Sequence, residues 1–298
     1  MLQLARRQGG VIRMAQLRQG YRWERISKWV GQGHLTSLGR GWLQLPDPDH
    51  DLMARFTRAQ AQIAEPLILC GLSAADYYGF GVVTDNKLHV TTAAGRSLAA
   101  PQGVVVHQAP PRSPILEWPD FRVIDRVDAA VDGARAVTGL DVLAQLDAAA
   151  AKGVTAEEVS RSLSLAGRRR GVLQVRRWHG FMAHDSGSAM ESRTRTRILE
   201  YGLPEPETQI LVATRSGNRY LDLGWGRYRL GLDYESEEFH TGDGRMASDR
   251  RRHNGLTDER WTMFYPTARD IYTEHQQFLV KVERALRAAG WDGELTPR

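Results

Sequence analysis

The chain has 298 residues, of which 42% are hydrophobic and 25% charged, and it contains a single cysteine. This is the composition of an ordinary globular protein that is long enough for two or three separate cores. One cysteine, Cys70, excludes an internal disulfide framework and a cysteine zinc site. The sequence has no apolar stretch long enough to span a membrane and no signal-peptide core, so we expect a cytoplasmic protein without a membrane partner.

The positive charge is concentrated at the N-terminus. Residues 1–45 hold eight Lys and Arg but only one acidic residue, Glu24, so their net charge is +7 while the whole chain carries +5. A basic segment joined to a nearly neutral body indicates a surface that binds phosphate, as in DNA.

Residues 1–46 are expected to form three short helices and a β-ribbon. The helices are predicted at 2–8, 14–18 and 23–31, and the ribbon at 35–43, where glycines permit a tight turn. Three helices followed by a ribbon are the layout of a winged helix-turn-helix. The run Pro46-Asp47-Pro48-Asp49 breaks the pattern and ends this segment.

The run ISKWVGQGHLTSLGRGWLQL, residues 26–45, resembles the N-terminal winged-helix domain of type IV toxin–antitoxin antitoxins, the AbiEi-like group. The resemblance implies that Arg22, Arg25 and Lys28 approach the DNA major groove. It also implies that Arg40 contacts phosphate. Two alternatives stay open. The cations are only the solvent-exposed face of a helix, or the domain binds another protein.

Residues 51–166 are expected to form a mixed α/β middle domain. Helices are predicted at 51–66, 72–78, 140–151 and 155–165, with Ser73 and Thr155 as N-caps, and strands at 87–92, 103–108 and 121–124. The region resembles the middle part of antitoxin-like chains, which implies a connector or an oligomerising platform and leaves a homodimer open. His34, His89 and His107 are interpreted as isolated core or surface residues, and Cys70 as a buried small hydrophobe.

A hairpin rich in carboxylates is predicted at residues 220–235. Alternation places Asp222, Asp233 and Glu235 on one face if the turn is centred on Gly226-Arg227, which would pair Asp222 with Gly231. Three carboxylates on one face repel one another, and Mg²⁺ or Mn²⁺ would supply the counter-charge. The alternative is an ordinary solvent-exposed face.

The hairpin lies within a regular succession of elements. A helix is expected to begin after Ser188 with Glu191 in its first turn, where Glu191 has both a capping-box interpretation and a functional one. A strand at 207–213 precedes the hairpin. A basic helix around 249–254, a strand at 261–265 and a long helix from Thr267 follow it.

This order, with its acidic residues, resembles the PD-(D/E)XK nucleases, and within them the Vsr-like endonucleases, over about residues 185–275. The resemblance implies a restriction-endonuclease-like core in a C-terminal domain, 185–298, in which Asp222, Asp233 and Glu235 bind Mg²⁺. Glu191 would bind the metal through water or orient a ligand. His240 and Asp249 would assist catalysis, and Arg250 and Arg251 would contact DNA. The chain departs from the branch in having Asp233 for Glu, Glu235 for Asp and Ser236 for Gly, and it lacks the lysine that the superfamily usually has at position 235.

The sequence thus predicts an α+β multidomain protein with a winged helix-turn-helix at 1–46, a mixed α/β middle region at 51–166 and a nuclease-like core at 185–298. The expected function is DNA binding joined to Mg²⁺-dependent endonuclease activity. The alternative is a non-catalytic, antitoxin-like transcriptional repressor with a degenerate nuclease fold and a cognate toxin. A pure protein-interaction scaffold is a third class.

Overall fold

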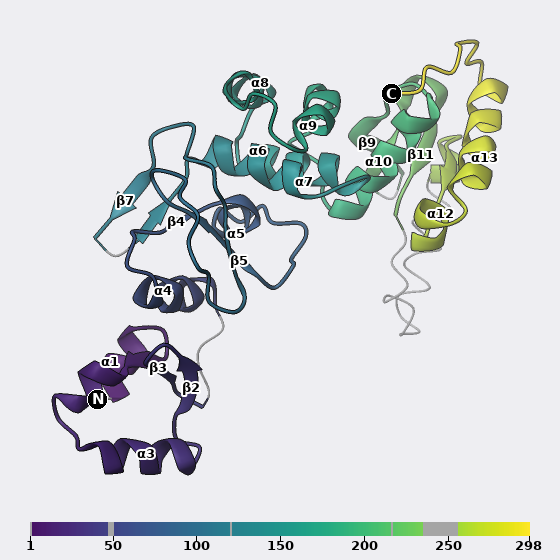
Figure 1. Ribbon diagram of the computed structural model, residues 1–298. Helices are drawn as coiled ribbons and strands as arrows, with labels where there is room; N and C mark the ends of the chain where they lie inside the picture. The colour runs from purple at the N-terminus through teal and green to yellow at the C-terminus, as the bar shows by residue number, and fades with distance from the viewer. Residues whose placement is uncertain (1, 47–50, 120, 216, 235–255) are drawn as a thin grey trace. The chain divides into compact units, whose positions relative to one another are not determined.

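The computed structural model describes residues 2–46, 51–119, 121–215, 217–234 and 256–298. The chain divides into two compact units, Met1–Gly133 and Ala134–Arg298, each with helices and a sheet or sheets (Figure 1). This confirms the predicted α+β class. The predicted middle domain, 51–166, extends over parts of both units. Among the described residues, no helix is long and apolar enough to cross a membrane.

The first segment of the N-terminal unit is a small helical domain with a three-stranded sheet in the order β1-β3-β2. Its elements are α1 (Leu2–Arg7), β1 (Val11–Arg13), α2 (Met14–Arg18), α3 (Trp23–Gly31), β2 (Thr36–Gly39) and β3 (Trp42–Gln44). The predicted helices are confirmed, with α2 and α3 at their predicted bounds, whereas β1 was not predicted. Apolar side chains of the helices and strands close a small core: Ala5, Ile12, Leu17, Ile26, Leu35 and Leu43.

The ribbon turn depends on backbone conformations that glycine favours. Gly39 pairs with Trp42, so only Arg40 and Gly41 connect the two strands. Both connecting residues have positive φ, 49° at Arg40 and 77° at Gly41, as the tightest hairpin turns require. The turn therefore holds Arg40 at the tip of the ribbon.

The rest of the N-terminal unit is built around a five-stranded sheet in the order β6-β5-β4-β8-β7. The strands are β4 (Ile68–Leu69), β5 (Leu88–Thr91), β6 (Val104–Val106), β7 (Leu116–Trp118) and β8 (Phe121–Val123). The helices are α4 (Leu52–Gln62) and α5 (Gly71–Tyr77), and α6 (Arg126–Ala136) crosses the boundary between the units. The strands β4 and β7 and the helix α6 were not predicted.

Two predictions for this sheet are wrong. Ser73 is not a helix cap, because α5 begins earlier and the Ser73 hydroxyl is buried, where it accepts a hydrogen bond from the His89 amide at 2.9 Å. His89 and His107 are not isolated, since their ring nitrogens lie 2.9 Å apart and the other His89 nitrogen lies 3.0 Å from Asp85. Cys70 is buried as predicted, and this burial raises the pKa of its thiol.

The C-terminal unit begins with helices and continues into a four-stranded sheet in the order β12-β11-β10-β9. The helices are α7 (Asp141–Ala150), α8 (Ala156–Leu165), α9 (Val172–Trp178), the 3₁₀ turn η1 (His179–Phe181), α10 (Ala189–Tyr201), α12 (Ala268–Tyr272) and α13 (His275–Ala288). The strands are β9 (Glu207–Thr214), β10 (Gly217–Trp225), β11 (Leu230–Leu232) and β12 (Thr262–Phe264).

Helices α10 and α13 pack through one apolar cluster with the hairpin strands. Leu223 and Leu232 pair across β10 and β11 and enter a core with Ile198 of α10 and Leu279 of α13. The strands β9, β10 and β11 are antiparallel in succession, whereas β12 runs parallel to β11. The predicted strand succession is therefore confirmed. The prediction of one long helix from Thr267 is wrong, because the helical conformation is interrupted between α12 and α13.

Candidate carboxylate site and basic surface

The strand register brings Asp222 opposite Asp233. Leu223 pairs with Leu232 and Gly224 with Gly231, so one step further along both strands sets the two aspartates against each other. The predicted pairing of Asp222 with Gly231 is wrong by two residues. The cause is the connection, which is a 3₁₀ turn, η2 (Gly226–Tyr228), followed by Arg229 in a left-handed conformation. A two-residue shift preserves which face a side chain occupies, so the two carboxylates still share a face.

The two aspartates are joined by reciprocal hydrogen bonds to backbone amides. The Asp222 amide donates to Oδ1 of Asp233 at 3.1 Å, and the Tyr234 amide donates to Oδ2 of Asp222 at 2.9 Å. Asp233 is buried and its own amide donates to the Phe264 carbonyl of the neighbouring strand at 3.1 Å. These hydrogen bonds hold the two carboxylates in fixed orientations.

Glu191 supplies a third carboxylate from the first turn of α10. The Ser188 hydroxyl caps the helix by accepting the Glu191 amide at 3.2 Å, which confirms half of the predicted capping box. The Glu191 carboxylate instead accepts the Gly187 amide at 2.8 Å. Burial raises the pKa of Glu191, and the charge of Asp233 adds to that rise, so these two carboxylates lie within electrostatic reach.

Gln209 of β9 is a member of this group that was not predicted. Its side-chain amide donates to Oε2 of Glu191 at 3.1 Å. Its backbone has φ 48°, a left-handed value inside a strand. The pairing of β9 with β10 passes from Ile210 and Leu221 to Thr208 and Leu223, and so omits Gln209 and Asp222. No periodicity in the sequence signals such a residue.

A buried ion pair and a more exposed one fix α10, and with it Glu191, to α7. Arg195 lies one helical turn after Glu191, and one of its nitrogens lies 2.6 Å from Oδ2 of Asp147. Both side chains are 2% exposed. Asp147 also accepts the Ala183 amide at 2.8 Å, which ties the segment before α10 to the same helix. On the exposed side of the contact, Arg193 pairs with Asp141 at 2.8 Å.

The donor set of this site suits a hard cation only in part. Carboxylate oxygens are the ligands Mg²⁺ prefers, and Mg²⁺ commonly uses one or two carboxylates and several waters. Within the described ranges, however, no group of three or more His, Cys, Asp or Glu is arranged to hold a metal ion. Asp222 and Asp233 therefore offer at most two protein ligands between them. The predicted third ligand, Glu235, lies outside the described residues, as do His240, Asp249, Arg250 and Arg251.

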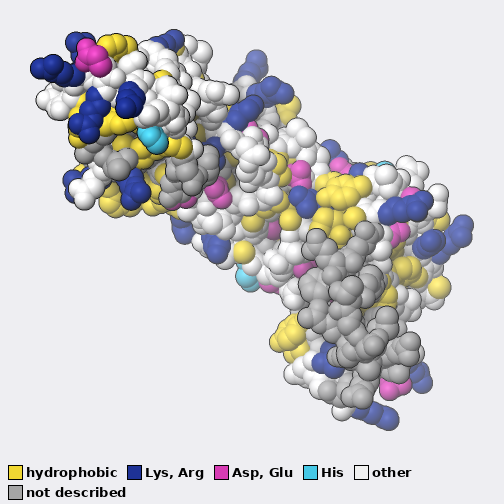
Figure 2. Space-filling view, turned by 90° about the horizontal axis from the view of Figure 1, so that it is seen from below, with side chains coloured by type: hydrophobic (Ala, Val, Ile, Leu, Met, Phe, Trp, Pro, Cys, Tyr) yellow, Lys and Arg dark blue, Asp and Glu magenta, His cyan; other side chains and the backbone are white. Residues whose placement is uncertain are grey.

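The predicted basic residues of the N-terminal segment are all exposed: Arg22, Arg25, Lys28 and Arg40. Figure 2 shows dark-blue Lys and Arg side chains spread over the face of the N-terminal unit that is turned to the viewer. Arg25 is held in place, since its guanidinium lies 5.5 Å from the Tyr21 ring centre and 5.4 Å from that of Trp29. A guanidinium stacked in this way is already oriented for planar contacts.

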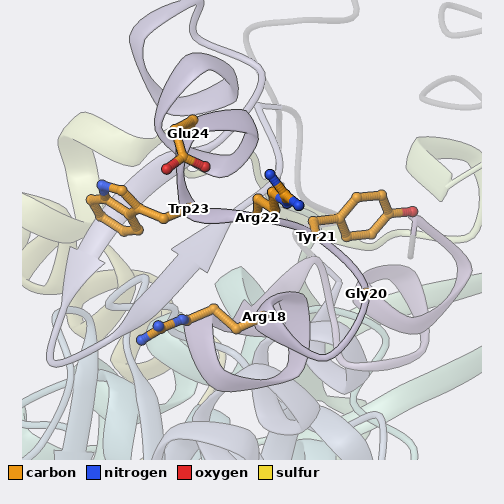
Figure 3. Close-up of a pocket in the computed structure, with 6 residues that line it drawn as sticks. All are labelled: Arg18, Gly20, Tyr21, Arg22, Trp23 and Glu24. Atoms are coloured by element: carbon orange, nitrogen blue, oxygen red, sulfur yellow. The ribbon is translucent and has the colours of Figure 1, made fainter.

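A shallow hollow of about 500 Å³ lies where α2 turns into α3. It is lined by Arg18, Gly20, Tyr21, Arg22, Trp23 and Glu24. Figure 3 shows Arg18 and Trp23 extending to the same side of this turn, whereas Tyr21 extends away from them. Trp23 is 54% exposed, so an indole and two guanidinium groups line an open surface at the start of α3.

No family model matches this chain. It is similar to two proteins of Mycobacterium tuberculosis, uncharacterized protein MT2308 of strain CDC 1551 / Oshkosh and uncharacterized protein Rv2248 of strain ATCC 25618 / H37Rv. Each is 27% identical over 284 residues, which cover 91% of this chain and 99% of the relative. The similarity therefore extends through both compact units.

Proposed function

We propose that this protein binds DNA and hydrolyses its phosphodiester bonds with Mg²⁺ or Mn²⁺. The observation that carries the proposal is that Asp222 and Asp233 lie opposite each other on neighbouring strands, with Glu191 close enough for the charge of Asp233 to affect its carboxyl group. Asp222 comes from β10, Asp233 follows β11, and Glu191 comes from the first turn of α10. A helix followed by three antiparallel strands and a parallel fourth supports a PD-(D/E)XK-like core.

In this proposal Asp222 and Asp233 would hold the cation, and Glu191 would orient a water beside it. The bound cation would lower the pKa of a water nucleophile and stabilise the negative charge that develops on the phosphate. The amide donors of Asp222 and Tyr234 fix both carboxylates in place, as hydrogen bonds to metal ligands commonly do. Glu235, His240 and Asp249 stay candidates for the remaining roles.

The N-terminal segment is proposed to be a winged helix that brings the protein to DNA. Its three helices, its three-stranded sheet and its sharp ribbon turn support that assignment. In it, α3 would enter the major groove with Arg25 and Lys28, and Arg40 at the ribbon tip would contact a phosphate. Arg22 would approach the groove with Arg25 and Lys28. Arg18, which lines the same hollow as Arg22, would add a contact to the DNA backbone.

The test is nicking of supercoiled plasmid and of branched or mismatched oligonucleotides with Mg²⁺ or Mn²⁺. The proposal expects cleavage by the natural chain and none by Asp222→Asn or Asp233→Asn. Asn218→Ala is the matched control, because Asn218 is an exposed residue of the same strand away from the carboxylates. Absence of cleavage on every substrate by a folded, DNA-binding protein would contradict the enzyme proposal.

The second candidate function is a non-catalytic transcriptional repressor, of the kind that acts with a cognate toxin. Asp222 and Asp233 each accept a hydrogen bond from a backbone amide, so both carboxylates have a structural role that needs no metal. This observation favours the repressor alternative. The repressor alternative expects tight, salt-sensitive binding to one DNA site without cleavage. It also expects Asp222→Asn to leave that binding unchanged.

A further inference from the structure

Gln209 combines a left-handed backbone with a side-chain hydrogen bond to Glu191. Its backbone is left-handed, with φ 48°, which costs free energy in any residue other than glycine. Its side chain is half-buried and donates to Oε2 of Glu191 at 3.1 Å. Such strain persists only where the surroundings compensate for it, and it concentrates at functional sites.

The strained backbone lies where the two strands meet the carboxylate site. The pairs on either side are Ile210 with Leu221 and Thr208 with Leu223. Gln209 and Asp222 therefore face each other at a break in the ladder. An extended backbone at position 209 would restore ordinary pairing and would change the direction of the side chain that now reaches Glu191.

The loop that precedes α10 is bound to the same short stretch of β9. The Thr208 hydroxyl donates to Asp185 at 2.7 Å, and the Gly187 amide donates to the same Glu191 oxygen that Gln209 contacts, at 2.8 Å. A Cβ at Gly187 would lie 3.0 Å from Oε1 of Glu191, so the loop backbone packs closely against the Glu191 carboxylate. Two donors thus converge on Oε2 of Glu191, the Gly187 amide from the loop and the Gln209 side chain from β9.

We infer that Gln209 is a positioning residue, whose amide holds the Glu191 carboxylate beside the Asp222–Asp233 pair and whose left-handed backbone is the conformation that makes this reach feasible. The effect of Gln209 on DNA cleavage rests on the proposed endonuclease function. The effect of Gln209 on the position of Glu191 is independent of that function. Gln209 itself contacts neither metal nor substrate in this inference, so its loss should change the reaction step more than DNA binding.

The test variant is Gln209→Asn. Asparagine tolerates the left-handed conformation but is one methylene shorter and cannot reach Glu191, so it removes the hydrogen bond without restoring an extended backbone. The matched control is Arg229→Asn, because Arg229 is also left-handed, with φ 48°, and is not part of the carboxylate group. Any general effect of asparagine in a left-handed position appears in both variants.

Two readouts decide the inference. In the ¹H–¹⁵N spectrum of the full chain, the Gly187 amide signal should move in Gln209→Asn, because it would then be the remaining donor of this pair to Oε2 of Glu191, and it should stay in place in Arg229→Asn. In the cleavage assay, kcat should fall by roughly ten- to hundredfold in Gln209→Asn while KM for DNA stays the same, as is usual on losing a partner that orients a ligand.

An unmoved Gly187 signal, or equal loss in both variants, would overturn the inference and leave Gln209 as a structural irregularity of the strand. If the natural chain cuts no DNA, the endonuclease proposal fails on its own, and the Gly187 signal still decides whether Gln209 holds Glu191. A fall in DNA affinity with unchanged kcat would also overturn it, since that result would make Gln209 a binding residue.

Discussion

Asp222 within β10 and Asp233 just after β11 hold the two strands together, because the Asp222 amide donates to the Asp233 carboxylate and the Tyr234 amide donates to the Asp222 carboxylate. Both side chains therefore have a structural role whatever else they do. The effect of removing a hydrogen-bond acceptor must therefore be measured separately from the effect of removing only the negative charge.

Substitutions at Asp233 make this separation. Asp233→Asn keeps an oxygen acceptor for the Asp222 amide, so the free energy of unfolding should change by less than about 1 kcal/mol. Asp233→Ala leaves that amide without its acceptor and should lower the free energy by about 1–3 kcal/mol. Urea denaturation of both variants measures the difference. Equal destabilisation by the two would show that the reciprocal hydrogen bonds contribute little.

Mg²⁺ or Mn²⁺ should raise the melting temperature of the natural chain, because a ligand bound only by the folded state stabilises it. Asp222→Asn should abolish the shift, whereas Asn218→Ala should keep it. The measurement is differential scanning calorimetry of metal-free protein titrated with each cation. An unchanged melting temperature at millimolar cation would mean that the carboxylates do not form a metal site in the absence of DNA.

Glu191 should make the protein less stable as the pH rises. The pKa of Glu191 is raised in the folded state by burial, so folding favours the protonated carboxyl. Its contribution to stability is therefore present below the ordinary glutamate pKa, about 4.3, and is lost as the pH rises through the higher folded value. Glu191→Gln keeps an acceptor for the Gly187 amide and should remove this dependence, which makes the variant more stable than the natural chain at neutral pH.

Unfolding in urea from pH 4 to pH 8 measures this dependence. Glu283→Gln is the control of opposite sign, because the Tyr201 hydroxyl and Arg287 lower the pKa of Glu283. That variant should lose the stability that Glu283 supplies above the ordinary glutamate pKa and that disappears as the pH falls. Parallel curves for Glu191→Gln and the natural chain would contradict the assigned shift.

Arg195→Ala should destabilise the C-terminal unit by about 3–5 kcal/mol, because it leaves Asp147 buried without its counter-charge. Arg269→Ala is the control, since the Arg269–Glu274 pair is exposed at 73% and 35% and should be worth less than about 1 kcal/mol. Chemical denaturation distinguishes the two. In the double variant Asp147→Asn with Arg195→Met, most of the lost stability should return.

The sequence predicted the N-terminal helices well because local signals decide them. The helix α3 lies between Gly20 and Gly33, and its apolar residues recur at helical spacing, with Ile26 buried. The strand β1 was missed because three residues between two helices are too few to show a period. The two wrong predictions around His89 have a tertiary cause, since only the fold brings Ser73 and His107 to it.

The carboxylate site was predicted in part. Face alternation placed Asp222 with Asp233, but the register was wrong because Arg229 adopts a left-handed conformation that nothing in its residue type announces. For the same reason Gln209 was not predicted. The capping position predicted Glu191 in the first turn of its helix and the resemblance predicted its role at the site, yet its carboxylate contacts Gly187 and Gln209 rather than the cap backbone.

DNA binding by the N-terminal segment should depend steeply on salt. Each Lys or Arg that neutralises a phosphate releases counterions, so the logarithm of the affinity falls linearly with the logarithm of the salt concentration. The exposed cations Arg22, Lys28 and Arg40 should each reduce that slope by about one when changed to Ala.

Arg25 should behave differently, because its guanidinium is stacked near Tyr21 and Trp29. Arg25→Lys keeps the charge but loses the planar, stacked group, so it should weaken binding to the preferred sequence by about 1–3 kcal/mol and leave the salt slope unchanged. Arg287→Lys is the control, since Arg287 is likewise stacked, 4.7 Å from the Trp291 ring centre, but belongs to the C-terminal unit.

Fluorescence anisotropy of the full chain with labelled duplexes, from low to high salt, measures both quantities. If Arg25→Lys lowers affinity equally for all sequences, Arg25 is a phosphate contact and not a base-reading residue. If affinity is the same at every salt concentration, the exposed cations do not bind DNA, and the N-terminal segment is better interpreted as a protein-binding module.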